Sequence, residues 1–397
     1  MPKLTLATRD HRRGRLDEIV KRLDLDALIL STPDFVEFAT QHGVTVQGWE
    51  RPFAVVLLAG GGSFAIFPDI SGNKLLAQQA RGDLWLDRWT HYAEIPRLEG
   101  RRQLTPHFPD ILAGLLVDAG LSRGRIGVDA AAPPIARALA ALPEARMVAA
   151  ATALREARLV KHPEEIAAMQ AAAALTDFAI ARYREEIRPG RVLGELDHGI
   201  AAQVMAQAAR EVPGEDFQIT RFMTLSGADS AAPHGDGAGT GAQVLADAVA
   251  TVICNVRLNG LGIENQRSFL VGNVGSEAER VAQTALAATE AGIAAASAGR
   301  PLSGVDEAAQ AVIERAGLGA HLLHRTGHGI GVATHEFPED MAFNPRPLLP
   351  GEVIVVEPGI YVRGLGGFRY VDVVPISDPA SAPLTRAPRD RAAMTIR

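Results

Sequence analysis

The sequence predicts two domains, an α/β domain at the N-terminal end followed by an α+β domain. Three observations lead to this fold class. The chain has 397 residues, which is more than one ordinary core accommodates. Helix and strand patterns alternate over the first part, whereas the second part sets long, Ala-rich helices apart from its strands. We therefore expect the α/β domain to cover residues 1–153 and the α+β domain to cover residues 154–397.

The first domain alternates helix and strand signals from its start. Residues 11–23 carry apolar residues at helical spacing, and residues 26–32 form a short apolar run that predicts a strand. Residues 51–69 contain two apolar runs around a Gly-Gly-Gly-Ser turn, which is typical of a β-hairpin. Further helices are expected at 73–81, 111–121 and 134–142, with a strand at 125–130.

The second domain is expected to begin with a long helix. Pro163 suits a first helical turn, and Glu164 and Glu165 follow it, where negative charge favours a helix N-terminus. The Gly-rich stretch 234–243 has no strand before it and no good helix start after it, so it predicts a turn and not a phosphate loop. The remaining elements expected are helices near 193–210, 276–298 and 303–316, and strands within 248–256, 266–272, 352–362 and 368–377.

The composition argues against several classes of partner. The net charge of -6 is small and the basic residues are scattered, which indicates neither nucleic-acid nor membrane binding. No stretch approaches the roughly 20 apolar residues of a membrane span, and no apolar stretch follows the N-terminal basic residues as in a signal peptide. Cys254 is the single cysteine, so no internal disulfide forms. These features predict a cytoplasmic protein.

The chemistry-bearing side chains of the second domain are histidines and glutamates near predicted strand ends and turns. Imidazole and carboxylate are the groups that a hydrolytic site uses for proton transfer or metal binding. A zincin helix is not expected, because "HEFPE" places a proline inside it. His324 is interpreted as structural and Glu336 as a surface carboxylate. The remaining candidates are His234, His328, His335, Glu264 and Glu357.

Five stretches occur in a specific order: "SGADSAAPH", "GLGIENQRSFLVG", "HRTGHGIGVATHE", "EPGIYV" and "GGFRYVDVVPIS". Together they resemble the pita-bread family of creatinase, aminopeptidase P and prolidase. The stretches "TPDFVEFATQHGV" and "GWERPF" resemble the creatinase-type N-terminal domain. The resemblance implies a creatinase-type α/β domain, a pita-bread α+β domain and a homodimer.

The metallopeptidases that this chain resembles hold two divalent ions with two Asp, one His and two Glu. His328 and Glu357 match two of these ligands, and Glu264 stands in place of the second aspartate. The first aspartate maps to Ile253 or Asn255, and the last glutamate maps to Val371. Two carboxylates are therefore missing, and a two-metal site is not expected. Glu264, His328 and Glu357 could hold one ion of Mn, Co or Zn, or the site could contain no metal.

The sequence therefore predicts a hydrolase that cleaves a C–N bond, of amide or amidine type, in a small molecule or dipeptide. In the creatinase-like interpretation His234 is the general acid/base, Glu264 and Glu357 orient substrate or water, and His328 and His335 donate or accept hydrogen bonds. The resemblance gives substrate contacts to Arg369, Gln266 and Arg51. Gln266 replaces a substrate-binding glutamate of creatinase and cannot pair with a guanidinium, so creatine itself is disfavoured.

Two other functions stay open. The chain could be an Xaa-Pro dipeptidase or an aminopeptidase P-like enzyme with a single divalent ion. It could also be a non-catalytic pita-bread binding protein, because ligands are missing. The retained histidines and Glu357 argue against this last function, since a pure binding protein has no use for them.

Overall fold

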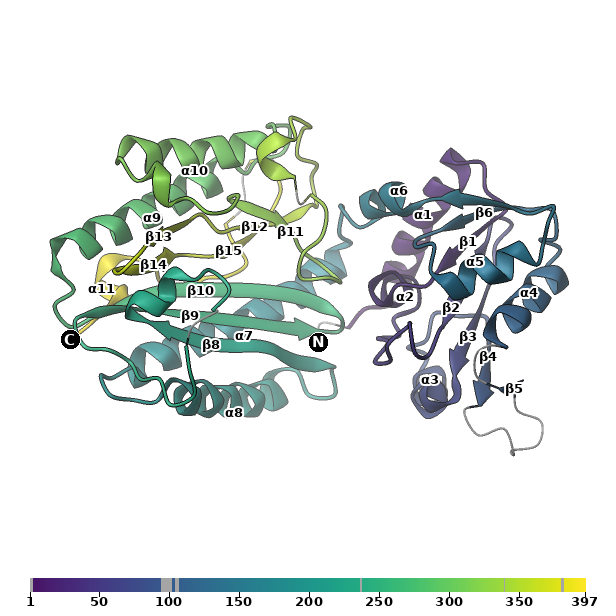
Figure 1. Ribbon diagram of the computed structural model, residues 1–397, viewed down its shortest axis with the longest axis horizontal. Helices are drawn as coiled ribbons and strands as arrows, with labels where there is room; N and C mark the ends of the chain where they lie inside the picture. The colour runs from purple at the N-terminus through teal and green to yellow at the C-terminus, as the bar shows by residue number, and fades with distance from the viewer. Residues whose placement is uncertain (1–2, 94–101, 104–106, 236–237, 339, 380–381) are drawn as a thin grey trace. The chain divides into compact units, whose positions relative to one another are not determined.

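A computed structural model describes residues 3–93, 102–103, 107–235, 238–338, 340–379 and 382–397. The chain divides into an N-terminal unit, Leu4–Arg158, and a C-terminal unit that contains Leu159–Arg397 (Figure 1). The boundary expected from the sequence, 153/154, lies a few residues before this division. None of the helices in the described ranges combines the length and the apolar character that crossing a membrane requires.

The N-terminal unit is an α/β domain built on a seven-stranded mixed sheet. The sheet order is β5-β4-β3-β2-β1-β6-β7, in which β1–β2 and β2–β3 are antiparallel and the other pairs are parallel. The predicted hairpin is confirmed, with Leu57 opposite Ser63 across its turn. The strands are β1 (Ala27–Leu30), β2 (Ala54–Leu58), β3 (Ser63–Pro68), β4 (Arg88–Ala93), β5 (Arg102–Gln103), β6 (Arg125–Val128) and β7 (Arg146–Ala149). The α-helices are α1 (Leu6–Arg22), α2 (Pro33–Thr40), α3 (Gly72–Arg81), α4 (Phe108–Asp118), α5 (Pro133–Ala140) and α6 (Ala151–Ala157).

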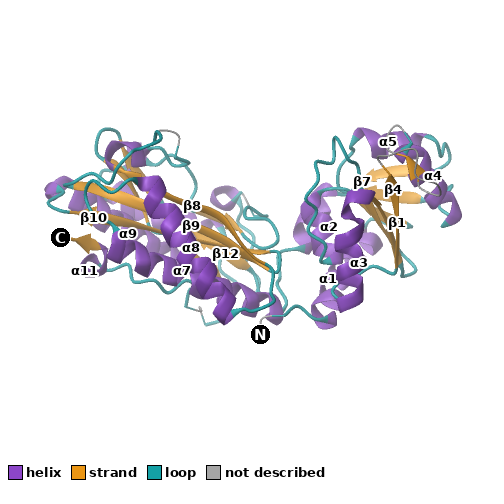
Figure 2. Cartoon of the chain, turned by 90° about the horizontal axis from the view of Figure 1, so that it is seen from below, coloured by secondary structure: helices purple, strands orange, loops and turns teal. Residues whose placement is uncertain are grey.

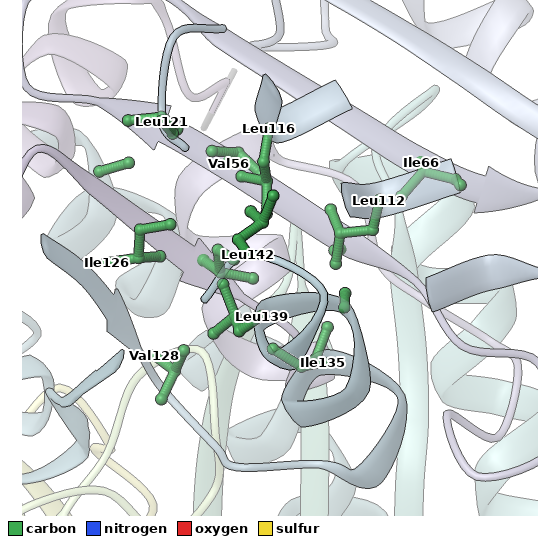
Figure 3. Packing of buried hydrophobic residues seen from close by; sticks show 14 of the residues in the cluster. Val56, Ile66, Leu112, Leu116, Leu121, Ile126, Val128, Ile135, Leu139 and Leu142 are labelled. Carbon is green, nitrogen blue, oxygen red and sulfur yellow. The ribbon is translucent and has the colours of Figure 1, made fainter. Parts of the chain in front are cut away.

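The core of this unit lies between the sheet and two helices. Leu112 and Leu116 of α4 and Leu139 of α5 are buried against strand residues such as Val56 and Ile126 (Figure 3). Each fully buried aliphatic side chain stabilises the fold by roughly 1.5–3 kcal/mol relative to exposure. This packing explains why the apolar pattern at 111–121 predicts α4.

The C-terminal unit contains a four-stranded sheet, order β16-β10-β9-β8, and smaller sheets of three and two strands. Helices α7 and α8 pack on one face of the large sheet (Figures 1 and 2). The α-helices are α7 (Pro163–Glu186), α8 (Leu193–Glu211), α9 (Gly275–Ala295), α10 (Ser303–Arg315) and α11 (Arg391–Met394). The strands are β8 (Phe217–Ser226), β9 (Ala248–Leu258), β10 (Leu261–Val271), β11 (Gly327–Gly329), β12 (Val353–Val356), β13 (Gly359–Val362), β14 (Gly366–Arg369), β15 (Asp372–Pro375) and β16 (Thr395–Ile396).

The long helix α7 begins at Pro163, as predicted. His162 caps it, because its side chain accepts from the Glu164 backbone N–H while the Glu165 carboxylate accepts from the His162 backbone N–H. This reciprocal arrangement satisfies donors that a helix N-terminus leaves unpaired. The predicted turn at 234–243 has no regular helix or strand among its described residues, and residues 236–237 lie outside them.

The turn between β9 and β10 sets the register that the site depends on. Asn259 and Gly260 both have left-handed backbone, with φ of 51° and 82°. Such a pair is the preferred two-residue turn of a β-hairpin because its twist matches that of the strands. The register that follows places Asn255 opposite Glu264 and Ile253 opposite Gln266. Paired residues point to the same face, so these side chains form neighbouring rows.

Candidate active site

A row of three polar side chains crosses β8, β9 and β10. Arg221 pairs with Asn255, and Asn255 pairs with Glu264. The Asn255 amide donates a hydrogen bond of 3.1 Å to Oε1 of Glu264, which is almost fully buried. This contact fixes the orientation of the Glu264 carboxylate.

The other carboxylate oxygen of Glu264 faces His328 on β11. His328 is fully buried, and its Nε2 lies 3.8 Å from Oε2 of Glu264 and 3.5 Å from Oε1 of Glu357. Glu357 follows the end of β12, where its backbone N–H donates to the Thr326 carbonyl at 2.6 Å. Two glutamates from distant parts of the sequence therefore flank one imidazole nitrogen.

His335 lies on a tight loop that returns to β11. Its ring stacks on that of His328, with centroids 3.8 Å apart and planes 16° apart. The loop closes through the Glu336 backbone N–H, which donates to the Gly329 carbonyl at 2.8 Å. Glu336 was expected to be a surface carboxylate, and this was wrong. Its side chain is only 1% exposed and pairs with the buried Lys161 at 3.2 Å.

The predicted site residues of the C-terminal unit surround one cavity of about 730 Å³. His328 is fully buried and is not one of the lining residues, but its Nε2 faces two of them, Glu264 and Glu357. Arg51 belongs to the N-terminal unit, where it pairs with Glu50 at 2.7 Å, and its substrate contact stays a prediction. The predicted residues among those that line the cavity are His234, His335, Glu264, Glu357, Gln266 and Arg369.

Two charged residues that line the cavity were not identified from the sequence. Arg221 lines the wall beside His234 and donates to the His234 carbonyl, and Arg325 follows His324 in the loop before β11. Arg325 could have been found by its position next to the "TGHG" motif. Arg221 lies on β8, a strand whose residues show no regular burial pattern, so its place in the site follows only from cross-strand pairing.

A hydrogen-bonded chain joins His324, Tyr361 and Arg369. His324 Nδ1 faces the Arg325 carbonyl at 2.7 Å, so this nitrogen carries the proton and Nε2 accepts from the Tyr361 hydroxyl at 2.8 Å. The Tyr361 oxygen in turn accepts from Arg369 at 3.2 Å. Arg369 also donates to the Pro233 carbonyl at 3.2 Å. Asp372 pairs with the buried Arg267 at 2.8 Å and with Arg389 at 3.1 Å.

Burial and charge separate the pKa values of these groups. Burial, and then the negative charge of Glu357, raise the pKa of Glu264 to about 7. Burial alone would raise the pKa of Glu357, but the adjacent His328 imidazole holds it below its usual value. Burial opposes the charged form of His328, yet the two glutamates raise its pKa. Burial and the charge of His328 lower the pKa of His335 to about 4, so His335 is neutral at pH 7.

The arrangement around His328 fits one metal ion. His328 Nδ1 lies 2.8 Å from the Gly329 carbonyl and donates to it, which leaves the Nε2 lone pair facing two carboxylates. Nε2 has no hydrogen-bond partner among the described residues. These three electron-rich atoms require a positive charge between them, either a proton or a cation. Ligands placed ~2.0–2.2 Å from a tetrahedral ion lie about 3.3–3.6 Å apart. The 3.5 Å separation falls in this range, and the 3.8 Å separation is slightly longer. The donor atoms of Glu264, His328 and His335 also lie within 4.8 Å of one another.

The next row of the sheet contains no carboxylate. Ile253 pairs with Gln266, and the Val371 backbone N–H donates to the Gln266 carbonyl at 3.1 Å. Ile253 and Val371 are both buried. These are the positions at which the sequence resemblance places two further metal ligands. The side chains present there offer hydrocarbon where a second hard cation would need oxygen.

Comparison with known proteins identifies the family. The model of metallopeptidase family M24 matches residues 167–378, more than half of the chain. The chain belongs to metallopeptidase family M24. Residues 12–160 of this M24 chain match the creatinase/prolidase N-terminal domain. The predicted pita-bread resemblance, the two-domain fold class and the assignment as a hydrolase of C–N bonds are therefore confirmed.

Related proteins cover most of the M24 chain. A probable dipeptidase PepE from Mycobacterium bovis is 29% identical over 354 residues, 88% of this chain and 87% of that protein. An Xaa-Pro dipeptidase from Pyrococcus furiosus is 28% identical over 240 residues, 60% of this chain and 66% of that protein. The crystal structure of dipeptidase PepE from Mycobacterium ulcerans matches with a TM-score of 0.81 and 24% identity, covering 99% of both chains.

Proposed function

We propose that this M24 chain is a dipeptidase-type enzyme that hydrolyses the amide bond of a small, dipeptide-like substrate with at most one divalent ion. The observation that carries the proposal is the approach of Glu264 and Glu357 to His328 Nε2 at the wall of a polar cavity. The names of its relatives, dipeptidase and Xaa-Pro dipeptidase, support the same substrate class. This choice favours the single-metal alternative of the sequence analysis over the creatinase-like interpretation.

Each polar residue at the cavity has its own role in the proposed hydrolysis. Glu264 and Glu357 orient the attacking water, and the Asn255 amide holds Glu264 in place. His234 is exposed at the cavity wall, where it can deliver a proton to the leaving nitrogen. Gln266 offers an amide to the substrate backbone. His335, neutral at pH 7, stacks on His328 and keeps that ring in position.

Glu264 and His328 would hold the ion together with His335, whose donor atom lies within 4.8 Å of theirs, and Glu357, 3.5 Å from His328 Nε2, would be a further donor. When bound, a divalent ion polarises the substrate carbonyl and lowers the pKa of water. We expect Mn, Co or Zn, since two carboxylates with imidazole suit these ions.

The test is hydrolysis of an Xaa-Pro and Xaa-Ala dipeptide panel by chelated protein, with and without added Mn, Co or Zn. Metal-dependent cleavage that is lost in Glu264→Gln and Glu357→Gln supports the proposal. Arg125→Gln is a control, because Arg125 belongs to the N-terminal unit and is none of these ligands. Absence of cleavage under every condition would refute it.

The creatinase-like function is the second candidate. Two observations favour it. Ile253 and Val371 are apolar at positions where a two-metal site would have carboxylates. The buried Nε2 of His328, which lacks a hydrogen-bond partner among the described residues, could carry a proton instead of binding an ion. In this case hydrolysis of a small amide or amidine would persist after complete chelation. Metal dependence therefore separates the two candidates.

A cytoplasmic homodimer completes the proposal. The single cysteine, Cys254, is buried and free, which suits a reducing compartment. The dimer rests on the family resemblance, in which the "GWERPF" stretch with Arg51 reaches a neighbouring subunit. Light scattering of the purified protein would test the dimer.

A further inference from the structure

A buried carboxylate on helix α10 has no part in the hydrolysis described so far. Asp306 lies in the first turn of α10 and is 4% exposed. Its Oδ1 accepts a hydrogen bond from the Thr326 backbone N–H at 2.7 Å, and its Oδ2 accepts one from the Gln310 side-chain amide at 2.5 Å. Both of these partners are neutral donors, so Asp306 acts toward them as a hydrogen-bond acceptor.

Thr326 connects Asp306 to Glu357. Thr326 is 2% exposed and lies directly before β11, and its carbonyl accepts a hydrogen bond from the Glu357 backbone N–H at 2.6 Å. Gly327 and Val356 are paired at the adjoining ends of β11 and β12. The bond between Thr326 and Glu357 therefore extends this ladder by one residue, at the point where the Glu357 side chain leaves the sheet.

The same anchor supports His324. The Thr326 N–H and the Arg325 carbonyl belong to one planar peptide group. The N–H donates to Asp306, and the carbonyl accepts from His324 Nδ1 at 2.7 Å. Hydrogen bonds at the two ends of one amide polarise it and strengthen each other. Asp306 thus supports the bond that leaves His324 Nε2 free to accept from Tyr361.

Packing alone does not fix the orientation of this peptide. A Cβ added to Gly292 of α9 would lie 3.6 Å from Thr326 Cγ2 and 2.9 Å from Val356 Cγ1, so α9 lies close against both residues. Apolar packing of this kind is non-directional. It holds Thr326 near α9, whereas a hydrogen bond also fixes the direction of the N–H. Asp306 supplies that directional contact.

We propose that Asp306 is a positioning residue of the active site. Its carboxylate fixes the Thr326 backbone, and through that backbone it orients Glu357 and His324. The inference rests on the proposed function, because it assigns Asp306 to the same hydrolysis. Removing a side chain that supports a metal-binding residue in this way typically lowers metal affinity or activity ~10–100-fold.

The experiment compares variants on helix α10. Asp306→Ala removes the acceptor, and Asp306→Asn keeps an acceptor oxygen in a side chain of the same size. Ile313→Ala is the control for lost stability, because Ile313 is fully buried on the same helix. Glu307→Ala, at an exposed neighbouring position, is the control for a lost carboxylate.

Two measurements are made on each variant. Hydrogen exchange followed by mass spectrometry reports the protection of segments 322–328 and 353–359 and needs no substrate. Steady-state kinetics use the most rapidly cleaved member of the Xaa-Pro and Xaa-Ala panel, well below the Tm of every variant. Asp306→Ala should lose protection in both segments and lower kcat ~10–100-fold with little change in KM. Asp306→Asn should retain most of both properties, and the two controls should keep the wild-type kcat.

Three results would overturn the inference. These are a kcat of Asp306→Ala equal to that of Ile313→Ala, equal damage by Asp306→Asn and Asp306→Ala, or unchanged protection of either segment in Asp306→Ala. If Asp306→Ala does not fold, Gln310→Ala replaces it, because it releases Oδ2 and should lower protection and kcat to a smaller extent. Unchanged values of both in Gln310→Ala would also overturn the inference. Absence of hydrolysis by the wild-type protein would refute the proposed function, and the exchange measurement would then decide the role of Asp306 alone.

Discussion

The side chain of His234 is exposed at the cavity wall, while its backbone carbonyl is held by Arg221. Removing the imidazole should therefore leave the local backbone intact. We expect His234→Ala to lower kcat by ~10²–10⁴-fold, the usual contribution of a general acid/base. Thermal unfolding should be unchanged within a few degrees. Near-wild-type turnover in this variant would remove His234 from the mechanism.

Glu264 provides a pH dependence of stability. Burial and the charge of Glu357 raise its pKa from 4.5 to about 7. Between these values the folded protein keeps a proton that the unfolded chain releases, so the free energy of unfolding falls as the pH rises. The stabilisation is complete below pH 4.5 and is lost as the pH passes 7.

Glu264→Gln removes this titration, because the amide stays neutral. In metal-free protein, the Tm of the variant minus the Tm of the wild type should increase as the pH rises from about 5 to about 7.5. Differential scanning calorimetry in chelating buffers would measure the difference. A Tm difference that does not change over this range contradicts the prediction.

The motifs locate Glu264, His328 and Glu357 because each lies in a short stretch with a specific local pattern. Arg221 and Lys161 are not located in this way. Their roles depend on which strands become neighbours and on how a loop folds back, and neither is a property of nearby sequence. The burial of Glu336 could not be predicted from the sequence for the same reason, since its partner Lys161 is 175 residues away in the chain.

The loop between β11 and His335 depends on one buried ion pair. Lys161 and Glu336 are 4% and 1% exposed, and Glu336 also accepts from the Ala333 backbone N–H at 3.0 Å. Breaking a buried pair by removing one partner costs about 3–5 kcal/mol, because the remaining charge is left uncompensated. Lys161→Met should therefore destabilise the C-terminal unit by that amount.

The double variant Lys161→Met/Glu336→Gln removes both charges of this pair and should regain much of the stability that Lys161→Met loses. Because the closed loop places His335 on His328, we expect kcat to stay low in the double variant even where the Tm recovers. Denaturant unfolding and steady-state kinetics would measure the two effects. Recovery of kcat together with stability would show that the pair does not position His335.

Strong local patterns predict individual elements well. The Gly-Gly-Gly-Ser hairpin, the start of α7 at Pro163 and the Ala-rich helices α9 and α10 follow from turn chemistry, capping and periodicity. The long strand β8 was not predicted. Its edge position leaves Phe217 to Met223 partly or fully exposed, so no alternating apolar pattern marks it.

At the scale of the whole molecule, two domains and their classes follow from length and element order, and the family resemblance follows from the order of five motifs. The arrangement of the strands inside each sheet does not. The sheet order β5-β4-β3-β2-β1-β6-β7 places β1 beside β6, which lies about a hundred residues later in the chain. Such non-local pairing is decided by packing of the complete core and leaves no local sequence signal.

The number of ions that one chain binds is a property of the complete site, and the C-terminal unit builds that site from several separate strands. Chelated protein titrated with Mn and analysed by mass spectrometry of metals should hold at most one ion per chain, because Ile253 and Val371 provide no oxygen. The double variant Ile253→Asp/Val371→Glu adds two carboxylates in the row beside Glu264 and should raise the stoichiometry toward two. The double variant Ile253→Asn/Val371→Gln, of similar size but uncharged, is the control and should remain at one or none. Two ions per chain in the wild-type protein would contradict the single-ion site and restore a two-metal peptidase.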